Sequence, residues 1–92
     1  MAARILLVED EEKLARMVEL ELQYEGYEVE KAFDGRAGLD RALSGEFDLV
    51  LLDIMLPALS GMEVLRRLRR ESAMPVIMLT ARDTVVDKVS GL

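Results

Sequence analysis

Short apolar runs alternate along the chain with segments in which apolar residues recur every three or four positions. The continuous runs are RILLV (4–8), FDLVLLD (47–53) and PVIMLT (75–80), and a further segment, YEVEKA (27–32), alternates apolar and polar residues. Continuous runs are typical of strands buried on both faces of a parallel sheet, and alternation is typical of a half-exposed strand. The pattern predicts three buried strands and one strand near an edge.

A helix is expected after each strand. The first, over residues 11–26, has an apolar stripe and a suitable terminator in Gly26, and residues 35–45 predict a weaker helix because Gly38 lies inside it. The stripe of the first helix consists of Leu14, Met17, Val18 and Leu22.

The third and fourth helices begin at recognisable capping residues. Ser60 and Glu63 have the spacing of a capping box at the start of a helix over residues 60–72. Asp83 is a good N-cap for a last helix. The core stripe expected in the third helix consists of Met62, Leu65 and Leu68.

The resulting order is strand, helix, repeated four times. Such alternation favours an α/β fold with a parallel sheet covered by helices on both faces. With 92 residues the chain is long enough for one core. We therefore expect residues 1–92 to form a single domain.

Acidic residues lie where the buried strands end. Glu9 and Asp10 follow the first strand, Asp53 ends the third, and Thr80 ends the fourth. Ligands of open parallel sheets bind beyond the carboxyl ends of the strands, so the three acids converge there if the first and third strands are neighbours. Unpaired carboxylates repel one another, and a hard cation such as Mg²⁺, which prefers oxygen ligands, would relieve this. A carboxylate placed there can also act as a nucleophile toward phosphorus.

Each of these residues also has a simpler interpretation. Asp53 could be a loop or capping acid without a function. Glu9 and Asp10 could be present because acids in the first turn of a helix interact favourably with its dipole. Threonine is common in strands, so Thr80 alone says little.

The composition excludes several kinds of chemistry. The chain has no cysteine and no histidine, which rules out disulfides, thiolate sites and serine–histidine triads. Its formal net charge of -6 makes broad attraction to nucleic acid or an anionic membrane unfavourable. No apolar run approaches the length needed to cross a bilayer, and the start of the chain does not resemble a signal peptide. We expect a cytoplasmic protein.

Two other groups of residues are interpreted as structural. The arginines of RRLRR (66–70) flank Leu68 on an amphipathic helix and are expected to form a solvated face. Met55 and Met62 are expected to fill gaps in the core rather than to bind a ligand through sulfur.

Three stretches together resemble a known family. ILLVEDEE (5–12), DLVLLDIMLPALSGMEVL (48–65) and PVIMLTA (75–81) are similar to motifs of the receiver domains of two-component response regulators, in particular those that precede a winged-helix DNA-binding domain. The resemblance implies a flavodoxin-like three-layer sandwich with strand order 2-1-3-4-5. Here we expect four strands in the order 2-1-3-4, without the fifth strand and helix.

The resemblance also implies roles for individual residues. Asp53 would accept a phosphoryl group from the phosphohistidine of a sensor histidine kinase. Glu9, Asp10, Asp53 and the backbone carbonyl of Met55 would hold Mg²⁺. Thr80 would hydrogen-bond the phosphoryl group and act as the conformational switch. Such a domain is a regulatory phosphoacceptor and not an enzyme, although Mg²⁺-dependent self-phosphorylation from small donors is compatible with it.

The sequence departs from the family pattern at its end. Family members carry a lysine after a fifth strand, and Lys88, expected in the last helix, is not assigned that role. We therefore expect a receiver domain that is incomplete at its C-terminus, with slow or absent phosphorylation. We also expect self-association through the exposed edge of the strand at residues 75–80. The alternative function is a receiver-like module for assembly or protein interaction without phosphotransfer.

Two other classes of protein fit less well. A flavodoxin-like nucleotide-binding module needs a glycine- or hydroxyl-rich loop after the first strand, whereas this chain has EDEE (9–12). Aspartate-nucleophile phosphatases use a second acid two residues after the nucleophile, and that position is Met55 here.

Overall fold

The computed structural model describes residues 2–79, in which strands and helices alternate as the hydrophobic pattern predicts. The last expected helix, with Asp83 and Lys88, lies outside the described residues, as does Thr80. The elements are β1 (Arg4–Val8), α1 (Glu12–Tyr24), β2 (Glu28–Ala32), α2 (Gly35–Leu43), β3 (Leu49–Asp53), α3 (Gly61–Arg69) and β4 (Val76–Leu79).

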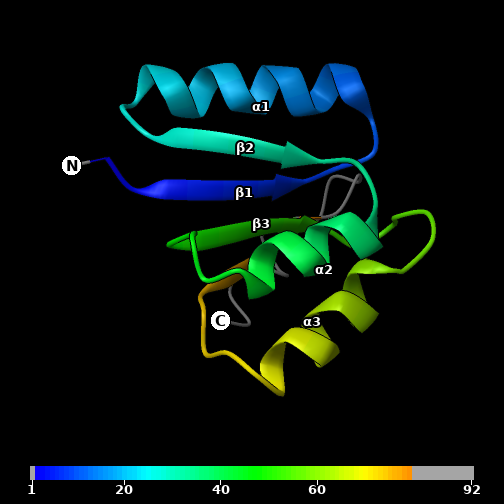
Figure 1. The fold of residues 1–92 in the computed structure, drawn as a ribbon. Coiled ribbons are helices and arrows are strands. Elements are labelled where there is room, and N and C mark those ends of the chain that lie inside the picture. Colours follow the sequence, from blue (N-terminus) through cyan, green and yellow to red (C-terminus); the bar gives the residue numbers. More distant parts are fainter. Residues whose placement is uncertain (1, 80–92) are drawn as a thin grey trace.

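The strands form one parallel sheet with the order β2-β1-β3-β4, which confirms the predicted order (Figure 1). β1 lies between β2 and β3, with Leu7 opposite Lys31 on one side and opposite Leu51 on the other. Within the part of the sheet that the structure describes, β2 and β4 are the edges. The placement of 27–32 near an edge is therefore confirmed, whereas self-association through β4 stays a prediction.

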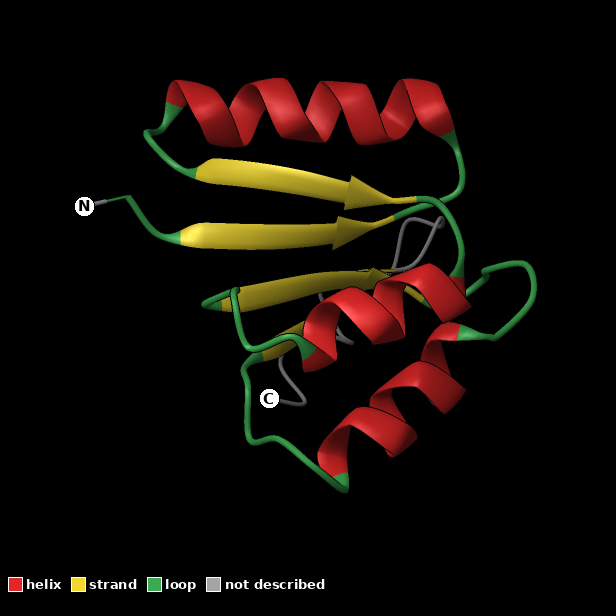
Figure 2. Ribbon diagram, viewed as in Figure 1, coloured by secondary structure: helices red, strands yellow, loops and turns green. Residues whose placement is uncertain are grey.

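Helices cover both faces of the sheet, which gives three layers (Figure 2). One face carries α2 and α3, whose Leu39 and Leu68 pack with Leu52 of the sheet. The other face carries α1, whose Ala15 packs with Ile5 and Leu7. Alternate residues of β1 and β3 contribute to the two cores, so residues 5–8 and 49–52 are all apolar.

The buried faces of two helices differ from the predicted stripes. In α1 the side chains of Leu14 and Met17 are exposed, with 63% of Met17 accessible, and the buried positions are Ala15 and Glu19. Glu19 is buried because it forms ion pairs with Lys31 of β2 at 3.0 Å and with Arg16 at 2.9 Å. Val18 and Leu22, the other two residues of the predicted stripe, are partly buried and pack against this core, so the prediction is confirmed in part.

A similar correction applies to α3 and to the two methionines. Val64 and Leu68 face the core, whereas Met62 is 56% exposed and Met55 is 67% exposed. The interpretation of Met55 and Met62 as core-filling residues was therefore wrong. Met55 lies in the connection after β3, and Met62 lies in the first turn of α3.

The helix ends follow local capping chemistry. Gly26 and Gly45 follow the ends of α1 and α2 with φ of 99° and 79°, a region that glycine enters without steric cost. Ser60 accepts a hydrogen bond from the Glu63 amide at 3.3 Å, as one half of a capping box. The other half is absent from the predicted pair, because the Glu63 carboxylate binds Arg66 and Arg67 instead.

The arginines of α3 are engaged within their own segment. Arg66 and Arg67 pair with Glu63, and Arg69 donates a hydrogen bond to the Met74 carbonyl at 2.6 Å. These contacts agree with the interpretation of residues 66–70 as a solvated face. No helix within residues 2–79 has the length and apolar character that would let it span a membrane.

Candidate functional site

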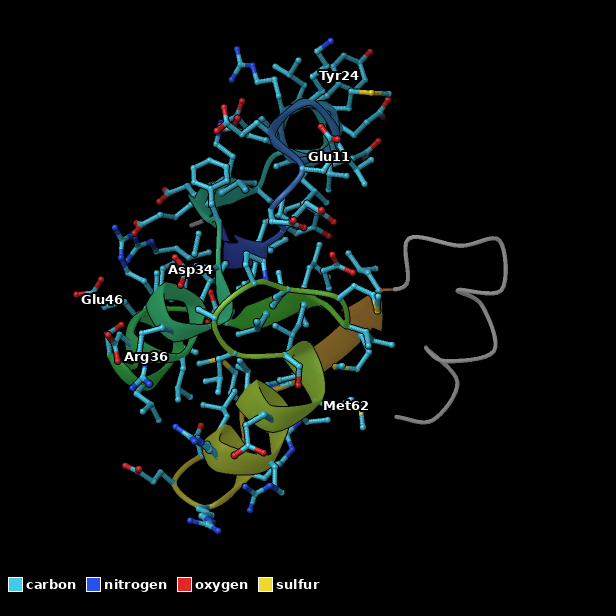
Figure 3. All side chains as sticks on the ribbon, turned by 90° about the vertical axis from the view of Figure 1, so that its right-hand side faces the viewer. Glu11, Tyr24, Asp34, Arg36, Glu46 and Met62 are labelled. Atoms are coloured by element: carbon cyan, nitrogen blue, oxygen red, sulfur yellow. The ribbon has the colours of Figure 1, made fainter. Side chains whose placement is uncertain are left out.

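The acidic residues at the ends of β1 and β3 lie together. Because β1 pairs directly with β3, Glu9 and Asp10 emerge beside Asp53, and one carboxylate oxygen of each lies within 4.8 Å of the other two. Figure 3 views the molecule from this side, with Glu11, Asp34 and Met62 marking the starts of α1, α2 and α3 around the strand ends. The convergence expected from the strand order is present.

Two of the three carboxylates are buried. Only 4% of Glu9 and 2% of Asp53 are accessible to solvent, whereas Asp10 is exposed. Burial raises the pKa of Glu9 and of Asp53 above their ordinary values, because the ionised form loses hydration, and the charge of Asp10 raises both further. When no cation is bound, the ionised carboxylates of this cluster repel one another.

Backbone amides fix the orientation of the buried carboxylates. The amide of Glu11 donates a hydrogen bond to Glu9 Oε2 at 2.9 Å, and the amide of Met55 donates to Asp53 Oδ1 at 3.3 Å. Both bonds favour the ionised form and partly oppose the effect of burial on the pKa. The two side chains are thereby held in place while their remaining oxygen lone pairs stay available.

The connection from β3 to α3 is anchored at both ends. The amide of Ile54 donates to the Leu79 carbonyl at 3.0 Å, and the amide of Gly61 donates to the Ile54 carbonyl at 2.9 Å. α3 begins so close to the end of β3 that a Cβ on Gly61 would overlap the Asp53 carbonyl oxygen and lie 2.8 Å from Ile54 Cα. Glycine at position 61 is thus a requirement of the site's backbone.

The donor set suits a hard divalent cation. Three carboxylates offer oxygen ligands only, and the ion pairs found for residues 2–79 join none of them to a basic side chain. Mg²⁺ is bound through few carboxylates with several waters retained, a pattern that a half-open cluster accommodates. The residues present therefore fit Mg²⁺ chemistry.

The contributions of the backbone around the acids were not predicted from the sequence. The Glu11 amide, Gly35 and Gly61 have no side-chain chemistry that would draw attention to them. The available signal was positional, since both glycines stand in the first turn of a predicted helix, where glycine has no advantage for helix formation.

The fold is thus a parallel α/β sheet with an acidic cluster at its carboxyl edge, and such a domain is suited to binding Mg²⁺. Residues 5–92 match the family model described as "Response regulator receiver domain". The chain belongs to this family, which is regulatory rather than catalytic. It is a receiver domain of a two-component response regulator.

Curated relatives share much of the sequence. The chain is 63% identical over 89 residues to the uncharacterized transcriptional regulatory protein YkoG of Bacillus subtilis. This match covers 96% of this chain and 39% of YkoG. It is 49% identical over 89 residues to the response regulator ArlR of Staphylococcus aureus, covering 97% of this chain and 41% of ArlR. The chain thus spans about two fifths of the length of these relatives.

Solved structures show the same architecture. The response regulator TrrA of Thermotoga maritima, determined in complex with Mg²⁺ and BeF, matches with a TM-score of 0.84 at 39% identity, covering 99% of this chain and 79% of TrrA. The chemotaxis protein CheY4 of Vibrio cholerae matches with a TM-score of 0.83 at 35% identity, covering 99% and 78%. The flavodoxin-like fold expected from the sequence is confirmed.

Proposed function

We propose that Asp53 is the phosphoacceptor of this receiver domain and that a sensor histidine kinase is the phosphoryl donor. The observation that carries the proposal is the position of its carboxylate, buried at the carboxyl end of a central strand beside Glu9 and Asp10. Of the three acids, Asp53 alone belongs to a strand, held on both sides by β1 and β4. The sheet thereby fixes the attacking group.

Mg²⁺ would be held by carboxylate oxygens of Glu9, Asp10 and Asp53, together with the backbone carbonyl of Met55. The cluster of three carboxylates supports this assignment, as does the Mg²⁺ complex of the similar receiver structure TrrA. When bound, the ion supplies positive charge that offsets the repulsion among the acids and the charge of the incoming phosphoryl group.

The chain's own residues would orient the reacting carboxylate. A carboxylate oxygen of Asp53 forms the new bond to phosphorus, while the bond from phosphorus to the donor's imidazole nitrogen breaks and that nitrogen keeps the electron pair. The Met55 amide, which donates to Oδ1, holds the carboxylate during the attack. Catalysis of this transfer consists mainly of positioning and charge stabilisation.

We further propose that phosphorylation controls transcription, since YkoG is named a transcriptional regulatory protein and ArlR a response regulator. Thr80 would hydrogen-bond the phosphoryl group and act as the switch. In this proposal the domain reports the state of a kinase and the chemistry of the output lies elsewhere.

The test is intact mass spectrometry after incubation with Mg²⁺ and a small phosphoryl donor. We expect the mass to increase by one phosphoryl group in part of the molecules, to depend on Mg²⁺, and to be absent in Asp53→Asn. Asp48→Asn, which changes an aspartate at the opposite end of β3, is the matched control and should behave as the unsubstituted chain. An equal mass increase in Asp53→Asn would contradict the assignment of the phosphoacceptor.

A further inference from the structure

The first residue of α2 touches the connection that carries Met55. Gly35 is buried, and its amide donates a hydrogen bond to the Pro57 carbonyl at 3.3 Å. A Cβ at position 35 would overlap the Leu59 carbonyl oxygen and would lie 2.7 Å from the Leu59 carbonyl carbon. These two nearest atoms belong to the backbone and the third is Leu59 Cβ, so none of them can rotate away as the end of a flexible side chain can.

The connection has little freedom to yield elsewhere. Its ends are joined by the hydrogen bond from Gly61 to Ile54, and Ala58 between them has a φ of 69°, where a residue with a Cβ is strained. The amide of Leu59 also donates to the Pro57 carbonyl at 2.7 Å. Residues 54–60 thus form a closed loop, which we call the β3–α3 loop, and Gly35 is its neighbour from α2.

We propose that Gly35 is a positioning residue for the Mg²⁺ site, acting through the β3–α3 loop. The close approach of α2 holds Pro57 and Leu59, and the loop in turn holds Met55, whose amide orients Asp53. A side chain at position 35 would push the loop away from α2 and displace the Met55 backbone. The inference rests on the proposed Mg²⁺ role of Asp53 and Met55.

Helix propensity alone predicts the opposite result. Alanine is favoured over glycine inside a helix, so Gly35→Ala would improve α2 if no loop lay against it. A weaker Mg²⁺ site in this variant would therefore report the contact with the loop and not a poorer helix.

The test is isothermal calorimetry of Mg²⁺ binding, with chemical unfolding recorded for each variant. We expect Gly35→Ala to weaken Mg²⁺ binding at least five-fold. The control is Ala42→Gly, which is expected to lower the free energy of unfolding through a change within α2. Ala42 lies in the buried second half of the helix, away from the loop. It should bind Mg²⁺ within two-fold of the unsubstituted chain.

A second variant covers the case in which Gly35→Ala does not fold. In Gly35→Ala/Ala58→Gly the loop can move aside, because glycine tolerates many more backbone conformations. We expect this chain to fold and to bind Mg²⁺ at least five-fold more weakly than Ala58→Gly alone. Binding equal to that of Ala58→Gly would overturn the inference.

The outcomes separate the two proposals. If the unsubstituted chain binds no Mg²⁺, the proposed metal site fails and the role of Gly35 fails with it. If the unsubstituted chain binds Mg²⁺ and folded Gly35→Ala binds it equally well, only the positioning role is overturned.

Discussion

The two ends of the sheet handle acidic residues in opposite ways. At the amino end, the guanidinium of Arg4 lies within 3.7 Å of carboxylate oxygens of Glu28, Glu30 and Glu46 and over the ring of Phe47. At the carboxyl end, the carboxylates of Glu9, Asp10 and Asp53 gather with no basic partner among residues 2–79.

The two groups of acids differ in what their charge does: one group stabilises the fold, and the other is available to bind a ligand. The acids around Arg4 are largely exposed and compensated, so they serve the fold. Glu9 and Asp53 are buried and uncompensated, and their pKa values are raised by that burial. A fold keeps such a cluster at a cost in stability, which a bound cation can offset.

The largest expected effect comes from adding one methyl group at the carboxyl end. Gly61→Ala should lower the free energy of unfolding by about 3 kcal/mol, because the new Cβ would overlap the backbone of Asp53 and Ile54. Urea denaturation measures this. Gly45→Ala in the turn before β3 meets no atom within 4 Å, and its positive φ should cost only about 1 kcal/mol. Equal losses would show that the two ends are equally tolerant.

Removing the cation at the amino end should have the next largest effect. Arg4→Met keeps an unbranched apolar side chain but removes the cation shared by three glutamates, of which Glu30 still pairs with Arg41, and we expect a loss of about 1.5 kcal/mol in low salt. The loss should shrink as salt is added, since these groups are partly exposed. Arg36→Met on the exposed side of α2 is the control and should change the free energy of unfolding little.

Removing a charge at the carboxyl end should have the opposite sign. Without Mg²⁺ at pH 7, Asp53→Asn should raise the free energy of unfolding by about 1 kcal/mol, because a buried carboxylate with neighbouring acids is replaced by a neutral group. The control is Asp48→Asn at the amino end of the sheet, where Asp48 accepts a hydrogen bond from the Arg4 amide. This substitution should not raise the free energy of unfolding.

The pH dependence follows from the raised pKa of Asp53. The folded state holds this proton to higher pH than the unfolded chain does, so the unbound protein loses stability as pH rises from the unfolded pKa to the folded one. The advantage of Asp53→Asn should therefore be full at neutral pH and should disappear in acid, where Asp53 is protonated in both states. Denaturation curves over a pH series would reveal this, and an advantage that grows in acid would contradict it.

The smallest expected effect concerns the β3–α3 loop. Ala58→Gly should raise the free energy of unfolding by about 0.5 kcal/mol, because glycine removes the steric cost of φ at 69° but adds freedom to the unfolded chain. Thermal unfolding with and without the substitution measures it. A clear loss of stability would show that Ala58 is not strained.

The sequence predicted the fold because the spacing of apolar residues follows burial. Both central strands are buried on both faces, so each appears as a continuous apolar run. It also predicted the meeting of Glu9 and Asp53, since parallel strands direct their carboxyl ends to one edge. It predicted the buried face of α1 only in part, since Val18 and Leu22 pack against the core whereas Leu14 and Met17 are exposed. There the pair of Glu19 with Lys31 made burial of a charged residue possible, and periodicity of apolar residues contains no information on such a pair.

The close contacts made at glycines could not be predicted from the sequence either. Gly38 was interpreted as weakening α2, yet a Cβ there would lie 2.7 Å from a methyl carbon of Val8, so its absence lets the helix pack onto β1. Gly35 acts in the same way against Leu59 of the β3–α3 loop, and Gly61 against the end of β3 and Ile54. A glycine's function in such a contact depends on which segment lies opposite, and only the three-dimensional arrangement provides that.

The most direct test of the central claim is the effect of Mg²⁺ on stability. With free Mg²⁺ at a hundred times its dissociation constant, the unsubstituted chain should gain about 2.7 kcal/mol in free energy of unfolding. Asp10→Asn, which removes one exposed charge of the cluster, should gain much less at the same concentration, whereas Arg4→Met should gain as much as the unsubstituted chain. An equal gain in Asp10→Asn would show that Mg²⁺ does not bind at the carboxyl end of the sheet.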